Sequence, residues 1–496
     1  MDDPGRRRIR KPGNKVVRRR VDAQQTMELP PPPRRRAVPS VHSNAKRFAL
    51  AYAALVLIGA TLLSTPISSE RREWTPFVDS LFTAISATSV TGLVTVDTQD
   101  HWNFFGELLI LIMIQLGGIG FMVGASLVLL TMRRSSSLRG SLIVRDGAPT
   151  ISVQEAGQLS RKILKFMFIT EGIGAAILTV EFYASSTGIW QSIWFGLFHA
   201  ISAFCNAGFD LQGGETSLIG FRDNWFVNLT VISLIQMGAL SFMVFGDLWD
   251  KRRLWQRGRL WSQRYWSRLA LDTKLVIITN YSLIIVGTVT FLIVEWDATL
   301  GTVSGPGDRV LASIFQSVSA RTAGFATISY AEAHSPTLFL WIALMAIGGA
   351  AGSTAGGIKL ATFAVLVLAV ISTIRGQTET QFSGRQIPTQ LVFRAMTIAT
   401  LYFGVHFMMT LLLALTEDII SDAEFGFLPL MFETMSALAT VGISTGITGE
   451  ITTAGKLVLC VAMFVGRLGP LTVMYALQRR ETPKNYSYPE SYVRLG

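Results

Sequence analysis

Phe82-Thr-Ala-Ile-Ser-Ala-Thr-Ser-Val-Thr-Gly92 is a stretch whose pattern recurs three more times along the chain. Phe198-His-Ala-Ile-Ser-Ala-Phe-Cys-Asn-Ala-Gly208 and Phe432-Glu-Thr-Met-Ser-Ala-Leu-Ala-Thr-Val-Gly442 follow the same register, and Phe315-Gln-Ser-Val-Ser-Ala-Arg-Thr-Ala-Gly324 is one residue shorter. A Ser-Ala pair precedes each glycine, and successive glycines are 116, 116 and 118 residues apart. A fixed internal period of this kind is typical of tandem structural repeats.

The composition indicates a polytopic membrane protein. Half of the 496 residues are hydrophobic, 16% are charged, and the mean hydropathy is +0.41. A soluble chain of this length would carry more charge. Several apolar runs approach the roughly 20 residues that a helix needs to cross a bilayer. Examples are Phe48–Ser64, Leu108–Leu130, Leu338–Ile347 and Leu457–Ala476.

Each copy of the pattern lies in the same order of apolar segments. A long segment is followed by a short one, such as Phe77–Ser89, then by the glycine turn and a second long segment. We therefore predict an all-α protein with four tandem helix–pore loop–helix repeats around a pseudo-fourfold pore, with eight spans. The predicted spans are Phe48–Ser64, Phe105–Met132, Lys162–Tyr183, Trp225–Trp249, Lys274–Trp296, Thr337–Ile374, Leu391–Leu415 and Lys456–Leu477. The predicted divisions are a tail at 1–47 and repeats at 48–135, 136–255, 256–376 and 377–496, the last including a C-terminal tail.

The net charge of +11 is concentrated at the N-terminus. Residues 1–47 hold 14 Lys/Arg and 4 Asp/Glu, whereas the remaining 449 residues hold 30 and 29. This segment is rich in Arg and Pro and lacks apolar periodicity, so we expect a disordered tail. A charge run beside a membrane span more often sets orientation or meets anionic membrane lipids than binds nucleic acid. Cys205 and Cys460 lie in apolar surroundings and are interpreted as buried thiols.

Charge asymmetry also predicts how the chain is oriented. The loops that join one repeat to the next are rich in Lys and Arg, whereas segments beside the short helices carry acids such as Asp97, Asp210 and Glu295. Basic loops tend to face the cytoplasm. We therefore expect a multi-pass protein with both termini in the cytoplasm and the four glycine turns near the outer leaflet.

The four glycine turns are the candidate ion-binding site. Irregular backbone at membrane depth occurs where it is buried in protein or lines water. Rings of backbone carbonyls can replace the water shell of a cation, and glycine reaches the required backbone angles without a Cβ penalty. Any one of these turns alone would indicate no more than a turn. The four candidate strips are Val90-Thr91-Gly92, Asn206-Ala207-Gly208, Thr322-Ala323-Gly324 and Thr440-Val441-Gly442.

A glycine-rich stretch interrupts the second long segment of the third repeat. A continuous helix from Thr337 to Ile374 would be about 57 Å long, far beyond one bilayer. We predict a broken helix with a flexible gating loop below the four turns. Close packing through small residues is the alternative interpretation. The candidate gate residues in this stretch are Gly348, Gly349, Gly352, Ser353, Thr354, Gly356, Gly357 and Lys359.

Arg467 is the last candidate gate residue. It lies 25 residues after Gly442, and Gly117–Gly118 and Gly348–Gly349 follow their own turn glycines at nearly the same spacing. This places it at the depth of the glycine-rich stretch. An arginine inside the membrane is costly and usually functional, so we interpret it as an electrostatic barrier. A snorkelling or paired structural arginine is the alternative.

Two further residues near the turns have structural interpretations. Arg321 would repel a cation if it faced the pore, so we expect it to point behind the third strip and pair with an acid, Glu433. His199 on the second short helix is interpreted as a packing residue rather than a ligand.

Assembled in this way, the chain resembles the Trk/Ktr/HKT potassium transporters. The resemblance rests on the four glycine turns, on Gly352-Ser-Thr-Ala-Gly-Gly-Ile-Lys359 and on Gly466-Arg-Leu-Gly-Pro470. It extends from about Phe48 to the end of the chain. Eight spans without an extra leading pair are most similar to the Ktr-type membrane subunit, and the ending Tyr486–Gly496 resembles that subfamily as well.

The resemblance implies a potassium-uptake subunit in the cell membrane. Gly92, Gly208, Gly324 and Gly442 match the family's filter glycines, the stretch 348–359 matches its gating loop, and Arg467 matches its cavity arginine. The resemblance also implies K⁺ as the transported ion, no organic cofactor on this chain, a homodimer with one pore per chain, and a cytoplasmic ring of nucleotide-binding regulatory subunits (KtrA-like). Some plant members carry serine at the first filter glycine and favour sodium, so glycine at position 92 favours potassium. The long N-terminal extension departs from the bacterial pattern.

Two other classes of protein are weighed against this interpretation. A sodium transporter or a sodium/potassium symporter on the same scaffold would share every feature described above. A membrane enzyme, such as a lipid or glycan transferase, would need acids or histidines clustered at an interface. The acids here are scattered over loops, and no HExxH, CxxC, Walker-type or serine-triad pattern has credible spacing.

Overall fold

The computed structural model describes residues 41–135, 153–185, 188–214, 217–250, 263–420 and 425–469, and the structural statements below concern these residues. They are mostly helical, with one antiparallel hairpin formed by β1 (Gln381–Phe382) and β2 (Arg385–Gln386). The tail before Val41, the predicted helix beyond residue 469 and most of the first two basic loops lie outside the described residues.

Each of the first two units contains a largely buried helix just before its glycine turn. The first unit comprises α1 (Val41–Leu63), α2 (Phe77–Ser89), the single turn α3 (Thr98–His101) and α4 (Phe104–Ser135). The second comprises α6 (Val153–Ala184), α7 (Ile189–Cys205), the 3-10 turn η1 (Ile219–Phe221), α8 (Trp225–Ala239) and α9 (Phe242–Asp250). The first helix therefore begins at Val41 rather than at Phe48, whereas α2 has the expected bounds.

The third and fourth units likewise contain a largely buried helix of 14 and 13 residues just before the glycine turn. The third comprises α11 (Gln263–Arg268), α12 (Leu271–Val294), η2 (Thr299–Thr302), α13 (Pro306–Ser319), α14 (Ser335–Met345) and α15 (Leu360–Ile374). The hairpin β1–β2 separates it from the fourth, which comprises α16 (Thr389–Ile420), α17 (Phe427–Ala439), η3 (Ile447–Gly449) and α18 (Thr453–Leu468). We refer to α2, α7, α13 and α17 as the short helices.

Within the part of the chain that the structure describes, four helices are long and apolar enough to cross a bilayer, and a bent pair would make a fifth. These segments are Phe104–Val123, Gly157–Ala184, Leu271–Val294, Thr389–Glu417 and the pair α8–α9. Many of their apolar side chains are exposed, including Ile173, Ile285 and Phe407. Exposed apolar helix faces of this extent require lipid rather than water, so the protein is a multi-pass membrane protein.

Two of the second long segments are broken. The third unit has the expected break, because α14 ends at Met345 and α15 begins at Leu360. The second unit has a break that the sequence did not predict: α8 and α9 meet at 91°. Ser241 at this corner has a φ of +71°, so the segment predicted as the span Trp225–Trp249 consists of two helices rather than one continuous helix.

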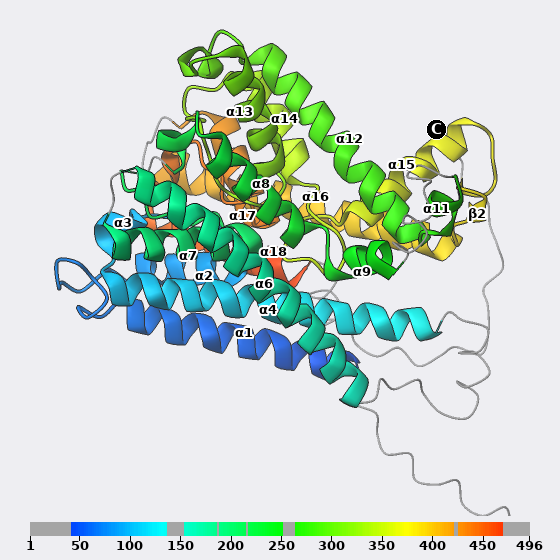
Figure 1. The fold of residues 1–496 in the computed structure, drawn as a ribbon, viewed down its shortest axis with the longest axis horizontal. Helices are drawn as coiled ribbons and strands as arrows, with labels where there is room; N and C mark the ends of the chain where they lie inside the picture. The colour runs from blue at the N-terminus through cyan, green and yellow to red at the C-terminus, as the bar shows by residue number, and fades with distance from the viewer. Residues whose placement is uncertain are drawn as a thin grey trace, which may run out of the picture.

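The short helices pack against the helices around them. Helix α2 contacts both α1 and α4, and Figure 1 shows these three elements together in the blue to cyan, N-terminal part of the molecule. Each short helix carries a phenylalanine with no exposed surface, and in a membrane protein such a ring stabilises the fold through van der Waals packing rather than through removal from water. These residues are Phe82, Phe198, Phe315 and Phe432. The helix that follows each of the first three glycine turns also contacts the short helix of the next unit: α4 packs on α7, α8 on α13, and α14 on α17. Helix α18 returns to α2, so the contacts form a closed cycle.

Polar clasps join the two long helices within three units. A glutamate at the end of the first long helix accepts hydrogen bonds from the start of the second. Asn224 donates to Glu181 at 3.0 Å, and Thr452 donates to Glu417 through its hydroxyl at 2.7 Å. In the third unit the backbone amide of His334 donates to Glu295 at 3.0 Å. In these three units the hydrogen bonds hold the end of the helix before the short helix close to the start of the helix after the glycine turn.

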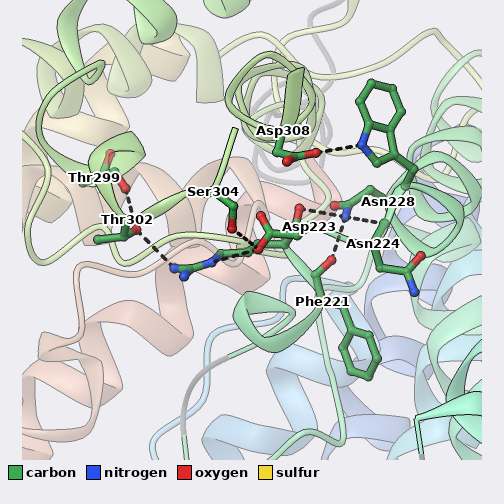
Figure 2. Close-up of polar contacts among 10 residues, drawn as sticks. Phe221, Asp223, Asn224, Asn228, Thr299, Thr302, Ser304 and Asp308 are labelled. Carbon is green, nitrogen blue, oxygen red and sulfur yellow. Dashed lines mark hydrogen bonds and ion pairs between the residues drawn. The ribbon is translucent and has the colours of Figure 1, made fainter. Parts of the chain in front are cut away.

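A further polar contact joins the second unit to the third (Figure 2). Trp225 Nε1 donates to Asp308 Oδ1 at 2.8 Å, and the hydroxyl of Ser304 donates to Asp223 Oδ2 at 3.0 Å. Arg222 Nη1 donates to the hydroxyl of Thr302 at 3.1 Å. Arg222 and Asp223 follow η1, and Trp225 begins α8. Thr302 ends η2, Ser304 precedes α13, and Asp308 lies in the first turn of α13. We call this side of the molecule, where the short helices begin, the mouth side.

Candidate functional site

Each of the four strips has the same unusual backbone. Its first residue is not glycine yet has a positive φ: 58° at Val90, 60° at Asn206, 69° at Thr322 and 51° at Thr440. Its last residue is the turn glycine, whose φ lies between 70° and 99°. Left-handed backbone at a residue with a Cβ costs roughly 1–2 kcal/mol, so the surroundings must impose it four times.

The strips also contact one another in a closed cycle. A Cβ built on each turn glycine would lie closer than 3.0 Å to the middle carbonyl oxygen of the following strip. The contacts run from Gly92 to Ala207, from Gly208 to Ala323, from Gly324 to Val441 and from Gly442 back to Thr91. The structure therefore brings together all twelve residues of the predicted strips, and no side chain fits at the four glycines.

The serine of each Ser-Ala pair supports the strip beside it. Ser86 and Ser436 accept hydrogen bonds from the backbone amides of Gly92 and Gly442, both at 3.1 Å. In the other two units the hydroxyl donates to the carbonyl after the glycine, from Ser202 to Phe209 at 2.7 Å and from Ser319 to Phe325 at 2.5 Å. The sequence showed this recurrent serine, but its spacing alone did not reveal its role.

A cavity of about 170 Å³ lies on the mouth side of the strips. All four turn glycines line it, together with Asp97 and Asp210. Burial raises the pKa of Asp210 to about 6, with the backbone amide of Gln212 opposing the rise and the Asp97 carboxylate adding to it. The cavity is therefore acidic above that pH, and an acidic cavity concentrates cations.

Several buried polar atoms at the strips have no protein partner among the described residues. They include the hydroxyls of Thr322, Thr440 and Ser353 and the side-chain nitrogen of Asn206. Buried polar groups normally bond to protein, water or an ion. A set of them beside the strips fits a hydrated or ion-conducting passage better than an apolar core.

The glycine-rich loop between α14 and α15 lies against the side of the strips away from the mouth. Backbone amides of Ala350 and Thr354 donate to the carbonyls of Ala239 and Gly238, at 2.8 and 3.3 Å. The hydroxyl of Thr354 lies 3.3 Å from Asn206 Oδ1. The other predicted gate residues of this loop are all in the same segment: Gly348, Gly349, Gly352, Ser353, Gly356 and Gly357.

Two cations hold this loop. Arg467 Nη1 donates to the carbonyl of Thr354 at 2.6 Å, and Nη2 donates to that of Gly117 at 3.3 Å. Lys359 Nζ donates to the carbonyl of Ala355 at 2.5 Å. Both cations also lie over the ring of Phe121, 4.5 Å away for the Arg467 guanidinium carbon and 4.9 Å for Lys359 Nζ. Phe121 was not predicted, because an apolar residue within an apolar helix gives no signal.

Two predictions beside the site have different outcomes. Arg321 points behind the third strip as expected, but the predicted pair with Glu433 was wrong. Its Nη1 donates instead to the side chain of Asn280 on α12. His199 is a packing residue, as expected: Nδ1 lies 2.8 Å from the carbonyl of Phe195, and Nε2 accepts from the amide of Leu211 at 3.3 Å. Both cysteines are free and buried, which confirms their interpretation.

A multi-pass helical protein with four glycine strips in contact and an arginine-held loop beside them belongs to the class of membrane transport proteins. The family model described as "TrkH: Cation transport protein" matches residues 38–488. The chain belongs to this family, whose members are ion transporters and not enzymes.

Curated relatives and a solved structure agree with the family. The chain is 35% identical to the potassium/sodium uptake protein NtpJ of Enterococcus hirae, over 92% of this chain and 97% of that protein. It is also 35% identical to the Ktr system potassium uptake protein B of Bacillus subtilis, over 90% of this chain and 96% of that protein. The crystal structure of the potassium transporter TrkH from Vibrio parahaemolyticus has the same fold, with a TM-score of 0.66 at 19% identity, covering 90% of this chain and 87% of that one.

Proposed function

We propose that this chain is the potassium-selective, ion-translocating subunit of a Ktr-type uptake system. The closed cycle of four glycine strips is the observation that carries the proposal. A cation that leaves water needs oxygen ligands, and rings of backbone carbonyls supply them without fixed charge. The twelve residues of the strips would form the filter, at the centre of a pseudo-fourfold pore built from four helix–pore loop–helix repeats with eight spans.

The mouth of this pore would gather cations before they lose water. Asp97 and Asp210 line the cavity beside the strips, and the four short helices end at the strips. The C-terminal end of a helix carries a partial negative charge and favours a cation there. Together these features raise the local cation concentration at the filter without providing a tight, fully charged site from which an ion could not leave.

The loop between α14 and α15 would be the gate. It is bonded by the last carbonyls of α8 and by Arg467, which donates to the carbonyls of Thr354 and Gly117, and we place the charge of Arg467 at the depth of this loop. A fixed cation at this depth opposes the passage of K⁺. Movement of the loop away from Asn206 would therefore be needed for rapid flux.

The proposed partners follow from the names of the relatives. "Ktr system" denotes an assembly of more than one component, and we infer a homodimer in the cell membrane with both termini in the cytoplasm. A cytoplasmic ring of nucleotide-binding regulatory subunits would act on the gate. The basic loops between repeats would face that ring and the anionic lipid surface.

The proposal is tested by complementation of a bacterial strain that lacks its own potassium uptake. The full chain should restore growth at low potassium, and uptake of rubidium or potassium by the same cells should rise with it. Growth that requires high potassium whether or not the chain is expressed would contradict the proposal.

Sodium transport, or sodium/potassium symport, is the second candidate. The observation in its favour is that the printed name of the Enterococcus hirae relative includes sodium. Varying sodium at fixed low potassium distinguishes the candidates, because a symporter needs sodium for potassium uptake and a uniporter does not. Gly92→Ser, which places a hydroxyl at the first filter glycine, should raise sodium uptake relative to potassium uptake if the strips form the filter.

A further inference from the structure

The residue that follows the buried phenylalanine of each short helix differs between the units. These residues are Thr83, His199, Gln316 and Glu433. All four are buried, and all occupy the same place in the repeat. Their chemistry ranges from a hydroxyl to a carboxylate, although the strips that follow them have nearly the same backbone.

In the second and third units this residue bonds the segment that follows the turn glycine. The amide of Leu211 donates to His199 Nε2 at 3.3 Å. Gln316 Nε2 donates to the hydroxyl of Thr327 at 2.9 Å, and its Oε1 accepts from the hydroxyl of Tyr330 at 2.7 Å. The side chain therefore ties the mouth side of the strip to the short helix from which it emerges.

In the fourth unit the residue at this position makes the most hydrogen bonds to the segment after the turn glycine, four in all. Glu433 Oε1 accepts from the hydroxyl of Ser444 at 2.7 Å and from the amide and hydroxyl of Thr445 at 2.8 and 3.1 Å. Its Oε2 accepts from the hydroxyl of Thr448 at 2.8 Å. In the first unit the hydroxyl of Thr83 bonds only its own helix among the described residues. The three partners of Glu433 also line the mouth cavity.

We propose that Glu433 is a positioning residue for ion selectivity, holding the mouth side of the fourth strip at the spacing that favours K⁺ over Na⁺. The proposal rests on the filter proposed above. Glu433 has no exposed surface, so it acts through Ser444, Thr445 and Thr448 rather than as an ion ligand. Selectivity by carbonyl oxygens depends on how firmly they are held, whether through cavity size or through the number of ligands.

The test compares three forms of the full chain: the wild type, Glu433→Ala and Glu433→Gln. Removing the carboxylate breaks all four of its hydrogen bonds, and only the contact between the hydroxyls of Ser444 and Thr448 remains among these donors. Glu433→Ala should therefore lower the ratio of K⁺ to Na⁺ uptake at least about tenfold. Gln keeps an acceptor and reproduces the chemistry of Gln316 in the third unit, so it should restore the ratio to within about twofold of wild type. Uptake of each ion is measured in cells or in liposomes with the purified protein.

Glu417→Ala is the matched control. Glu417 lies in the same unit, is also fully buried, and accepts from Thr452 and Thr416, but it joins α16 to α18 away from the strips. It should lower the melting temperature without changing the ion ratio. A merely structural role for Glu433 predicts the same outcome for both alanine variants.

Two results separate failure of this inference from failure of the proposed function. A folded Glu433→Ala protein with the wild-type ion ratio overturns the inference and leaves the potassium pathway intact. A wild-type protein that does not distinguish K⁺ from Na⁺ overturns the proposed function and this inference with it. If Glu433→Ala does not fold, the inference is tested with the double variant Ser444→Ala, Thr448→Val. This variant removes two of the hydrogen bonds to Glu433 and keeps the carboxylate. It should lower the ratio, and an unchanged ratio counts against the inference.

Discussion

At the scale of single residues, backbone strain marks the functional segment. Val90 is the clearest case, because a β-branched residue rarely adopts a φ of 58°. Its amide donates to the carbonyl of Ala87, and the amide of Thr91 donates to that of Ser86 at 2.8 Å. These bonds close the end of α2 and offset the strain in part. The same strained conformation occurs at the first residue of all four strips. This recurrence indicates that the function of the strips requires this backbone conformation.

Gly208→Asp should abolish selective K⁺ uptake. A Cβ at this position would lie 2.7 Å from the Cα of Gly324 and 2.9 Å from the carbonyl oxygen of Ala323, at a φ of +70°. The strip must then move, and we expect uptake to fall at least about tenfold, equivalent to about 1.4 kcal/mol in the barrier. Gly220→Ala is the control, because a Cβ there meets nothing within 4 Å. Normal selectivity in an inserted Gly208→Asp protein would remove these turns from the ion pathway.

Asp210 predicts a pH dependence of uptake. Its pKa of about 6 means that the side chain is mostly ionised at pH 7 and mostly protonated at pH 5. Loss of that charge lowers the cation concentration in the mouth cavity, so K⁺ uptake at low concentration should fall as the outside pH drops from 7 to 5, by about two- to tenfold. Because burial disfavours the ionised form, Asp210→Asn should not destabilise the protein at pH 7. Asp210→Asn should have the low K⁺ uptake at both pH 7 and pH 5. A wild-type pH profile in this variant would show that Asp210 is not the group responsible for the pH dependence.

The sequence predicted the strip residues but not their lateral partners. Four copies at a constant spacing identified the glycines, because the period is visible without knowing the fold. The pair between Arg321 and Glu433 was wrong because both residues bond across elements whose packing no spacing reveals. Asn280 lies on α12, Ser444 lies on the loop after the fourth strip, and Thr448 lies in η3.

At the scale of elements, the break between α8 and α9 creates a support for the gate. The 91° bend frees the last carbonyls of α8, and Gly238 and Ala239 then accept from the amides of Thr354 and Ala350. A continuous helix would satisfy those carbonyls internally. The sequence predicted the break in the third unit from its many glycines. The break in the second unit depends on Ser241 in a left-handed conformation, which only the packed structure reveals.

Arg467→Ala should raise K⁺ flux. The change removes the hydrogen bond to the carbonyl of Thr354 and one of the two positive charges at the loop, so the electrostatic barrier falls and the loop loses one of its restraints. Flux in liposomes should increase by about tenfold or more. Arg467→Lys separates the two contributions, because it keeps the charge and loses the fork that bonds both Thr354 and Gly117. Unchanged flux in the alanine variant would favour a purely structural arginine.

At the scale of the whole molecule, units that follow one another in the sequence are neighbours in the structure, and the fourth unit contacts the first. Each second long helix packs on the next short helix, and α18 packs on α2 (Figure 1). The repeat period predicted four similar units around one pore, but it could not predict which helices would meet where the fourth unit closes on the first. That contact depends on the angle between successive units, which is set by packing across every interface. Polar contacts on the mouth side, such as those of Figure 2, fix the same angle between the second and third units.

The ion pair between Lys456 and Asp79 tests this closure directly. Lys456 Nζ, at the start of α18, lies 2.8 Å from Asp79 Oδ1 in the first turn of α2, and both side chains are 15% exposed. Removing one partner leaves a partly buried charge without its counter-ion, so Asp79→Asn and Lys456→Gln should each destabilise the protein by about 1–2 kcal/mol. The double variant should cost less than the sum of the single changes, by about 1 kcal/mol. The measurement is thermal unfolding in detergent, with K⁺ selectivity followed in parallel. If the costs add, the two residues are not coupled, and closure depends on the apolar contacts of α18 with α2 alone.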